Sequence, residues 1–253
     1  MIGIDLSHKR AVVTGGSRGI GRAIALQLAR AGARVGISYQ SRGEAAQAVL
    51  NELKATAVDA WAEPGDLADE AAAERLIQRA VQEFGGLDIL VANAGIWLPE
   101  YVNIATMTAQ QWRRTLAVNL DSIFYVTRAA ARMMASNGRI VLISSTAGQR
   151  GEAGHADYAA SKGAVISLVK GLCVELAPRQ ITVNSVAPGW VDTEMAADPF
   201  AGEGRARIEA AIPIGRVASA DDIAGPVLFL SSDLARHITG EILNVNGGSI
   251  LCG

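Results

Sequence analysis

The chain alternates short apolar runs with longer amphipathic stretches over nearly its whole length. Short runs in which almost every residue is apolar are typical of strands buried on both faces of a sheet, whereas the longer stretches have helical periodicity. Strands are expected at residues 11–14, 34–38, 58–62, 87–92, 139–144, 181–187 and 241–246. Helices are expected at residues 19–31, 44–55, 69–84, 108–134, 155–176 and 220–231.

Strands that alternate with helices along a chain imply right-handed strand–helix–strand units. Such units build a parallel sheet with helices on both faces. The expected fold class is therefore α/β, a doubly wound Rossmann-type parallel sheet of about seven strands. No linker, internal repeat or low-complexity stretch interrupts the pattern, so residues 1–253 are expected to form one domain.

Composition and charge exclude several classes of protein. Half of the residues are apolar and 19% are charged, which is typical of a globular chain and excludes a disordered one. A net charge of -2 gives no reason to expect nucleic acid or an anionic membrane as partner. Two cysteines, Cys173 and Cys252, provide neither a disulfide framework nor a metal site. Without an apolar leader or membrane-length run, a cytoplasmic protein is expected.

A glycine-rich turn follows the first expected strand and leads into the first expected helix. Glycines in such a turn let the backbone approach a pyrophosphate, whose charge is favoured by the helix amino terminus. No Gly-Lys-Ser/Thr follows, which argues against a phosphate loop of the nucleotide-hydrolase type. The turn therefore predicts a dinucleotide site, with contacts from Gly15, Ser17, Arg18, Gly19, Ile20 and Gly21.

The end of the second expected strand favours NADP(H) over NAD(H). NAD-binding sheets of this type place an acidic residue there to bind the ribose hydroxyls. Here the sequence continues Tyr39-Gln40-Ser41-Arg42, without an acidic residue before Glu44. Arg18 and Arg42 are expected to converge on a 2′-phosphate, with Ser41 beside them. NAD(H) stays open as an alternative.

Tyr158 and Lys162 are four residues apart in a stretch that is expected to be helical. That spacing places both side chains on one helix face. A cation about 4 Å from a phenol favours the phenolate by roughly 4 kcal/mol at an effective dielectric near 20. Such an interaction would bring the Tyr158 pKa from about 10 to about 7, where a general acid or base works best.

With these motifs, the chain resembles the short-chain dehydrogenase/reductase family across essentially its whole length. Within that family it is most similar to 3-oxoacyl-[acyl-carrier-protein] reductases and to relatives that act on sugars, steroids and small alcohols. The resemblance implies an oxidoreductase that interconverts a ketone and a secondary alcohol. The matching residues are the glycine turn, Asn93-Ala94-Gly95, Asn119, Ser145, Tyr158, Lys162 and Pro188-Gly189.

The resemblance also implies a role for each matching residue. Tyr158 would be the acid/base that protonates the carbonyl oxygen, and Ser145 would hydrogen-bond the same oxygen. Lys162 would lower the Tyr158 pKa and bind the nicotinamide ribose, and Asn119 would hold a water on a proton path. Further cofactor contacts are implied at Asp66, Leu67, Asn93, Ala94, Gly95, Pro188, Gly189, Val191 and Thr193.

The substrate is not fixed by these motifs. Trp97, His155 and Trp190 are expected to shape the substrate pocket, and residues 196–207 are expected to form a mobile lid. Arg179 matches a basic position with which the 3-oxoacyl reductases dock the acidic carrier protein. Ser136 and Asn137 stand where the companion basic residue is expected, so acyl carrier protein is only weakly supported as a partner.

Two other functions remain open. One is an NAD-dependent sugar or polyol dehydrogenase on the same fold. The other is a dinucleotide-sensing regulator without turnover, although a sensor has no need of the Ser145, Tyr158, Lys162 and Asn119 set. The resemblance further suggests a homotetramer, with the helices around Asn119 and Tyr158 packed between subunits.

Overall fold

The strands form one parallel sheet. The computed structural model describes residues 3–251, and in that range the sheet has seven strands in the order β3-β2-β1-β4-β5-β6-β7. All neighbours are parallel, so the predicted doubly wound α/β fold is confirmed. The strands are β1 (Arg10–Val13), β2 (Arg34–Tyr39), β3 (Ala60–Pro64), β4 (Ile89–Ala92), β5 (Arg139–Ile143), β6 (Thr182–Pro188) and β7 (Ile242–Val245).

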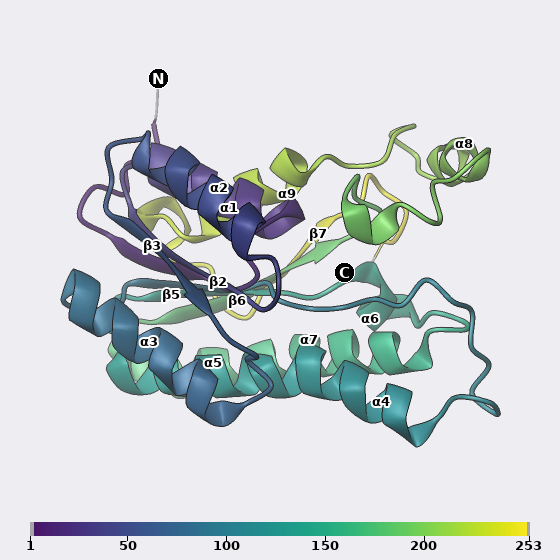
Figure 1. Cartoon of the computed structure of the whole chain (residues 1–253), viewed down its shortest axis with the longest axis horizontal. Coiled ribbons are helices and arrows are strands. Elements are labelled where there is room, and N and C mark those ends of the chain that lie inside the picture. Colours follow the sequence, from purple (N-terminus) through teal and green to yellow (C-terminus); the bar gives the residue numbers. More distant parts are fainter. Residues whose placement is uncertain (1–2, 252–253) are drawn as a thin grey trace.

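Helices cover both faces of the sheet (Figure 1). One layer contains α1 (Gly19–Arg30), α2 (Gly43–Lys54) and α9 (Ala220–Leu230). The other contains α3 (Glu70–Phe84), α4 (Ala109–Leu116), α5 (Ser122–Met133) and α7 (Ala156–Leu176). The short helices α6 (Thr146–Arg150) and α8 (Gly204–Ala210) follow β5 and β6, respectively.

Two hydrophobic cores lie on opposite faces of the sheet. Along β1, Val13 belongs to the core beneath α1 and α9, whereas its neighbour Val12 belongs to the core beneath α3 and α5. Along β4, Val91 and Leu90 alternate in the same way. Side chains of a strand point alternately to its two faces, so a strand covered on both faces must be apolar throughout. This explains the uninterrupted apolar runs of the sequence.

The strand order creates a crevice beside β1. The chain runs outward from β1 to β3 and then returns to place β4 on the other side of β1. The loops that leave the carboxyl ends of β1 and β4 therefore diverge toward opposite faces, and ligands of open α/β sheets bind at such a point. The glycine turn follows β1, and Asn93-Ala94-Gly95 follows β4.

The structure differs from the sequence predictions in several elements, and the ends of others, such as β4, shift by one or two residues. The helix predicted for residues 108–134 is divided into α4, a π-helical turn η1 (Ala117–Asp121) and α5. The third strand begins at Ala60 and not at residue 58, because its pairing with β2 begins where Ala60 lies opposite Val35. Helices α6 and α8 were not predicted, since each spans only five or seven residues, too few for a helical period to be recognised.

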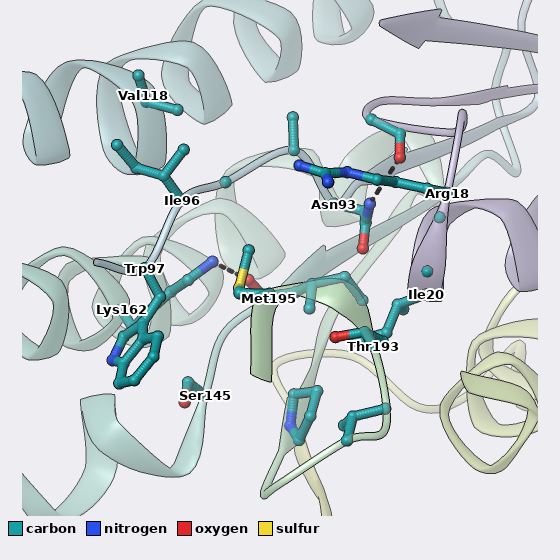
Figure 2. Close-up of a pocket in the computed structure, with 18 of the residues that line it drawn as sticks. Arg18, Ile20, Asn93, Ile96, Trp97, Val118, Ser145, Lys162, Thr193 and Met195 are labelled. Atoms are coloured by element: carbon teal, nitrogen blue, oxygen red, sulfur yellow. Dashed lines mark hydrogen bonds between the residues drawn. The ribbon is translucent and has the colours of Figure 1, made fainter. Parts of the chain in front are cut away.

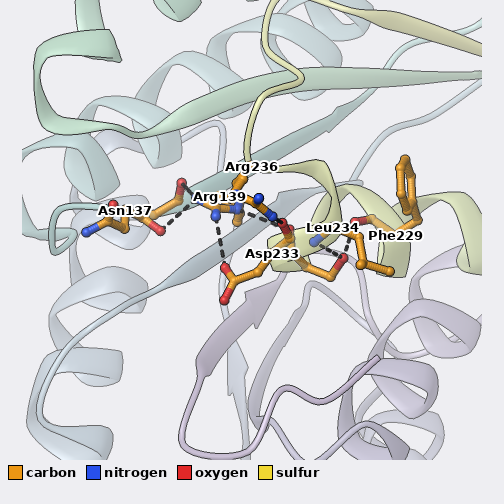
Figure 3. Close-up of polar contacts among 8 residues, drawn as sticks. Asn137, Arg139, Phe229, Asp233, Leu234 and Arg236 are labelled. Atoms are coloured by element: carbon orange, nitrogen blue, oxygen red, sulfur yellow. Dashed lines mark hydrogen bonds and ion pairs between the residues drawn. The ribbon is translucent and has the colours of Figure 1, made fainter. Parts of the chain in front are cut away.

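A buried arginine joins the amino end of β5 to the segment after α9 (Figure 3). The Arg139 side chain is only 7% exposed. Its guanidinium donates to the Asn137 and Gly138 carbonyls at 2.8 and 3.0 Å and to Asp233 Oδ1 at 3.1 Å. These acceptors offset the loss of water around the charge. Since β5 ends at Ile143, this contact lies at the opposite end of the strand from Ser145 and is structural.

Cys173 is a free, partly buried thiol on α7, and Cys252 lies outside the described residues. Among residues 3–251, no helix combines the length and apolar character required to span a bilayer.

Candidate active site

A cavity of about 330 Å³ lies at the carboxyl ends of the central strands. Its size is within the range of ligand pockets. Figure 2 shows Arg18 and Ile20 on one side of it, Trp97, Lys162 and Ser145 on the other, and Thr193 and Met195 between them. All residues predicted to contact a cofactor line it: Gly15, Ser17, Arg18, Gly19, Ile20, Gly21, Ser41, Arg42, Asp66, Leu67, Asn93, Ala94, Gly95, Tyr158, Lys162, Pro188, Gly189, Val191 and Thr193.

The glycine turn is locked to the loop that follows β4. Thr14 Oγ1 accepts hydrogen bonds from the backbone N–H groups of Asn93 and Ala94, both at 2.9 Å. Gly15 has a φ of +65°, and a Cβ on Gly21 would lie 2.2 Å from the Gly15 carbonyl oxygen, so only glycine fits the turn at Gly21. Among residues 3–251, no side chain caps the amino terminus of α1. Its first N–H groups are therefore available to an anion.

At the outer end of the cavity, the two predicted arginines converge. Arg18 Nη1 lies 2.5 Å and Arg42 Nη1 2.9 Å from the same atom, Oε2 of Glu194. The three side chains are about half exposed. The Arg18 guanidinium holds the pKa of the Glu194 carboxyl below its usual value. The two arginines were predicted to converge on an anion, but Glu194 was not predicted to lie between them.

At the reacting end, Tyr158 and Lys162 share one face of α7, as predicted, and Ser145 lies opposite them at the start of α6. Ser145 Oγ caps α6 by accepting from Ala147 N at 3.1 Å, and its hydroxyl hydrogen-bonds Tyr158. Lys162 is 4% exposed, and its Nζ donates to the Ile143 carbonyl at 2.9 Å. Burial lowers the pKa of Lys162 to about 8.

The predicted lowering of the Tyr158 pKa is wrong. Burial, together with the negative charge of Glu152, raises the pKa of Tyr158 to about 12 against the opposing hydrogen bond from Ser145. Lys162 Nζ lies 5.8 Å from the centre of the Tyr158 ring and is directed to a backbone carbonyl. Removing water from a phenolate therefore outweighs the distant ammonium, which is itself poorly solvated.

Asn119 lies behind the cavity and does not line it. It sits in the π-helical turn and is fully buried. Its Oδ1 accepts from Ile96 N at 2.7 Å, and its Nδ2 donates to the Ile96 carbonyl at 2.8 Å. A Cβ on Gly95 would lie 3.2 Å from Asn119 Oδ1 and 3.5 Å from Lys162 Nζ, so both polar groups face the same point of the backbone. Asn119 thus holds the loop after β4 against α7.

Two of the three residues predicted for the substrate pocket line the cavity. Trp97 and Trp190 do so and meet edge to face, with ring centres 5.9 Å apart. His155 is not among the lining residues and stacks on Trp97, with ring centres 4.7 Å apart. Phe200, from the predicted lid, packs against Trp190 at 5.9 Å. His155 therefore supports Trp97 from behind.

Several lining residues were missed by sequence reasoning. Arg150 is the last residue of α6 and Glu152 follows that helix, and burial raises the pKa of Glu152. Ile96, Val118 and Met195 add apolar surface. An acidic residue six positions before Tyr158 was a visible signal for Glu152. Val118 and Met195 lie in short helical turns, Arg150 in α6 and Ile96 in the loop after β4, and the sequence pattern does not define how these segments meet at the cavity.

Arg179, the predicted carrier-protein contact, makes its hydrogen bonds within this chain. Its guanidinium donates to the carbonyls of Ala131 and Met134 at the end of α5. These carbonyls have no partner within their own helix, so Arg179 closes the helix terminus. This observation weakens the case for carrier-protein docking through Arg179.

The cavity lies beside β1, where the strand order reverses. It has an uncapped helix terminus that suits an anion at one end, and Ser145, Tyr158 and Lys162 at the other. These features define a dinucleotide-dependent oxidoreductase of Rossmann type. A family model described as enoyl-(acyl carrier protein) reductase matches residues 15–249. The chain is 42% identical to 3-oxoacyl-[acyl-carrier-protein] reductase FabG of Staphylococcus aureus, over 95% of this chain and 97% of that protein.

Solved structures agree with the sequence comparison. A short-chain dehydrogenase from Burkholderia cenocepacia in complex with NADP superposes with a TM-score of 0.91 at 42% identity, over 96% of this chain and 98% of that one. A blue fluorescent protein from a metagenomic library, in complex with NADPH, has a TM-score of 0.92 at 38% identity, over 98% and 100%. The chain belongs to the short-chain dehydrogenase/reductase family.

Proposed function

We propose that this protein reduces a ketone to a secondary alcohol with NADPH, and catalyses the reverse oxidation with NADP⁺, with Tyr158 as the proton donor and acceptor. One observation supports this most strongly. The hydroxyls of Ser145 and Tyr158 meet at one end of a single cavity, and two guanidinium groups converge at its other end.

The residues present fit NADP(H). The uncapped helix terminus suits the pyrophosphate, and Arg18 and Arg42 already hold a carboxylate oxygen between them. No acidic residue stands between the end of β2 and Glu44 to bind an unphosphorylated ribose in preference. The structures from Burkholderia and from the metagenomic library, which contain NADP and NADPH, support the same choice. When bound, the cofactor supplies the hydride.

A protonated phenol is the form of Tyr158 that reduction needs. With a pKa raised to about 12, Tyr158 keeps its proton at neutral pH and can give it to the carbonyl oxygen as negative charge develops there. The Ser145 oxygen accepts from Ala147 N, and its hydrogen, which is donated to the Tyr158 oxygen in this structure, can be donated to the substrate oxygen instead. Two hydroxyl donors then stabilise the same developing oxyanion.

Lys162 supports the phenolate that the transfer leaves behind. With a pKa of about 8, the Lys162 amine is charged roughly ten to one at neutral pH. It stands beside the Tyr158 ring in a site with little water, where a positive charge stabilises a new phenolate more than it would in solvent. Asn119 is a positioning residue, because its amide hydrogen-bonds the backbone of Ile96 and so fixes the loop that faces Lys162.

The 3-oxoacyl reductase of Staphylococcus aureus suggests an acyl substrate with a ketone at the third carbon. Trp97 and Trp190 line the substrate side, which suits a compact ketone with apolar groups beside the carbonyl. Acyl carrier protein stays a weak proposal, because Arg179 closes α5. A cytoplasmic location is likewise retained as a proposal.

A homotetramer is proposed from the outer face of α5 and α7. Phe124 on α5 is 45% exposed and Val174 on α7 is 72% exposed. Both helices belong to the layer on one face of the sheet (Figure 1). Large apolar side chains left exposed on such helices are typical of subunit contacts. Light scattering at several protein concentrations tests this assembly.

Turnover of NADPH and of NADH against a panel of ketones tests the proposed function. The panel contains a 3-oxoacyl thioester, the matching 3-oxo ester, a diketone, a quinone and a ketose. We expect reduction of the thioester or ester with NADPH and much slower reduction with NADH. A preference for NADH with the ketose would replace the proposal by a sugar or polyol dehydrogenase. No turnover of any substrate, with tight NADPH binding, would favour a sensor.

A further inference from the structure

Glu194 holds the two arginines that are assigned to the cofactor phosphate. Its Oε2 lies 2.5 Å from Arg18 Nη1 and 2.9 Å from Arg42 Nη1. In the described part of the chain, neither guanidinium has an ion pair with any other acid. The arginines come from the loops after β1 and β2, whereas Glu194 comes from a segment about 150 residues further along, after β6.

A phosphate and Glu194 cannot use the same two nitrogens together. A phosphate oxygen bound to both Nη1 atoms at about 3 Å would take the position of Glu194 Oε2. A carboxylate left beside it would face a group with a charge of nearly -2, and like charges in contact repel. Binding of a 2′-phosphate by Arg18 and Arg42 therefore requires the Glu194 side chain to move.

Glu194 is also part of the cavity wall. Thr193, Glu194 and Met195 line the cavity in sequence, and η3 (Glu194–Ala196) begins at Glu194. Figure 2 shows Thr193 and Met195 between the two ends of the cavity. The same segment continues to Phe200, which packs on Trp190 beside the substrate side. Displacement of the Glu194 side chain therefore removes a contact that holds this wall at the outer end.

We propose that Glu194 is a built-in competitor for the 2′-phosphate, so that it sets cofactor selectivity and links phosphate binding to the segment that closes the cavity. This inference rests on the proposed use of NADP(H). A dinucleotide without the 2′-phosphate leaves the Arg–Glu194–Arg contact intact. A dinucleotide with the phosphate replaces one anion by a stronger one and releases residues 193–196 from the outer end.

The solvent exposure of Arg18, Arg42 and Glu194 limits how much the loss of the Glu194 charge can change phosphate binding. Because the side chains are about half exposed, each ion pair contributes at most about fivefold to an equilibrium constant. Removing the Glu194 charge should therefore tighten binding of a 2′-phosphate ligand by roughly three- to tenfold at low salt. The gain should shrink as salt screens the pairs.

Isothermal titration calorimetry with two probes that undergo no reaction tests the proposal. The probes are 2′,5′-ADP, which has the 2′-phosphate, and 5′-AMP, which lacks it. Glu194→Gln keeps the shape of the side chain and removes its charge. Glu203→Gln is the matched control, because Glu203 is exposed in the following segment and has no ion pair within residues 3–251.

We expect Glu194→Gln to bind 2′,5′-ADP three- to tenfold more tightly than the wild type and to bind 5′-AMP equally well, with Glu203→Gln unchanged for both. Tryptophan fluorescence gives a second readout, with Trp190→Phe as the reference that isolates Trp190. 2′,5′-ADP should change the Trp190 signal in the wild type and change it less in Glu194→Gln.

The outcomes separate this inference from the cofactor assignment. If the wild type binds both probes equally, NADP(H) selectivity and the role of Glu194 are both wrong. If the wild type prefers 2′,5′-ADP and Glu194→Gln binds it no better, Glu194 is not a competitor. Weaker binding by Glu194→Gln would assign Glu194 the opposite role, a clasp over the bound phosphate, and would overturn the proposal.

Discussion

The two ends of the cavity hold charges in opposite environments. At the reacting end, Lys162 is 4% exposed and its amine is held by a backbone carbonyl. At the outer end, Arg18, Arg42 and Glu194 are about half exposed and pair with one another. Burial moves the pKa of Lys162 to about 8 and that of Tyr158 to about 12. Exposure leaves the outer charges in contact with water and salt.

The reacting end therefore determines the chemistry, and the outer end determines which cofactor binds. A buried group changes its proton affinity by several orders of magnitude when water is removed, so the reacting end sets the protonation states. Exposed ion pairs contribute little each and respond to salt, so the outer end can exchange one anion for another. Variants at the two ends should therefore differ in which quantity they change.

The largest expected effect is at Tyr158. Tyr158→Phe removes the proton donor and keeps the ring, so kcat should fall by about a thousandfold. The Kd for NADPH should change by less than about threefold, because the phosphates bind elsewhere. Stopped-flow reduction and fluorescence titration measure the two quantities. Tyr125→Phe, outside the cavity, is the control and should keep wild-type kcat. Near-normal turnover by Tyr158→Phe would refute the assigned mechanism.

Lys162→Met should lower kcat by about a hundredfold and stabilise the fold. The Lys162 pKa falls from 10.5 unfolded to about 8 folded, which costs about 3 kcal/mol of unfolding free energy at pH 7. Because the unfolded chain binds more protons between these values, wild-type stability should rise as the pH passes from about 8 to about 10.5.

Urea denaturation at several pH values checks this prediction. The variant should be more stable than the wild type at pH 7, and the difference should shrink toward pH 10. A variant that is less stable at pH 7, or a difference that does not depend on pH, would show that the Lys162 amine is well solvated by its surroundings.

At the outer end, Arg42→Ala should weaken NADPH binding by about three- to tenfold, because Arg42 is about half exposed and water screens its contact with the phosphate. NADH binding should stay within about twofold, because it lacks the phosphate. Arg30→Ala, an exposed arginine in the last turn of α1, is the matched control. An equal loss for NADPH and NADH would mean that Arg42 contacts another part of the dinucleotide.

The smallest effect is that of salt. Raising the ionic strength from about 0.01 to about 0.5 M shortens the screening length severalfold. The Kd for NADPH should rise by a fewfold more than the Kd for NADH, whereas kcat at saturating cofactor should stay constant. A kcat that falls steeply with salt would place exposed charges at the reacting end.

Local sequence features predicted most of the scaffold. Uninterrupted apolar runs located the strands, and the glycines after β1 located the nucleotide site, because both depend on neighbouring residues. The spacing of Tyr158 and Lys162 gave their common helix face. Three-dimensional context decided the rest. The Tyr158 pKa depends on water exclusion and on Glu152, whose place beside the phenol is set by the loop after α6.

Other residues show the same limit. Nothing in the sequence around Glu194 indicates that it meets arginines from the loops after β1 and β2. The π-helical turn at Asn119 interrupts an amphipathic pattern that remains helical throughout, so residues 108–134 were expected to be one helix. His155 is one helical turn before Tyr158, but the ring of Trp97 stands between it and the cavity.

The protonation state of Tyr158 is the central claim, and ultraviolet difference titration of the protein against Tyr158→Phe measures it directly. If burial controls the phenol, the difference spectrum should show no ionisation between about pH 6 and pH 10, consistent with a pKa of about 12. An ionisation step near pH 7 would show instead that the Lys162 ammonium governs Tyr158 and would contradict the assignment of a protonated proton donor.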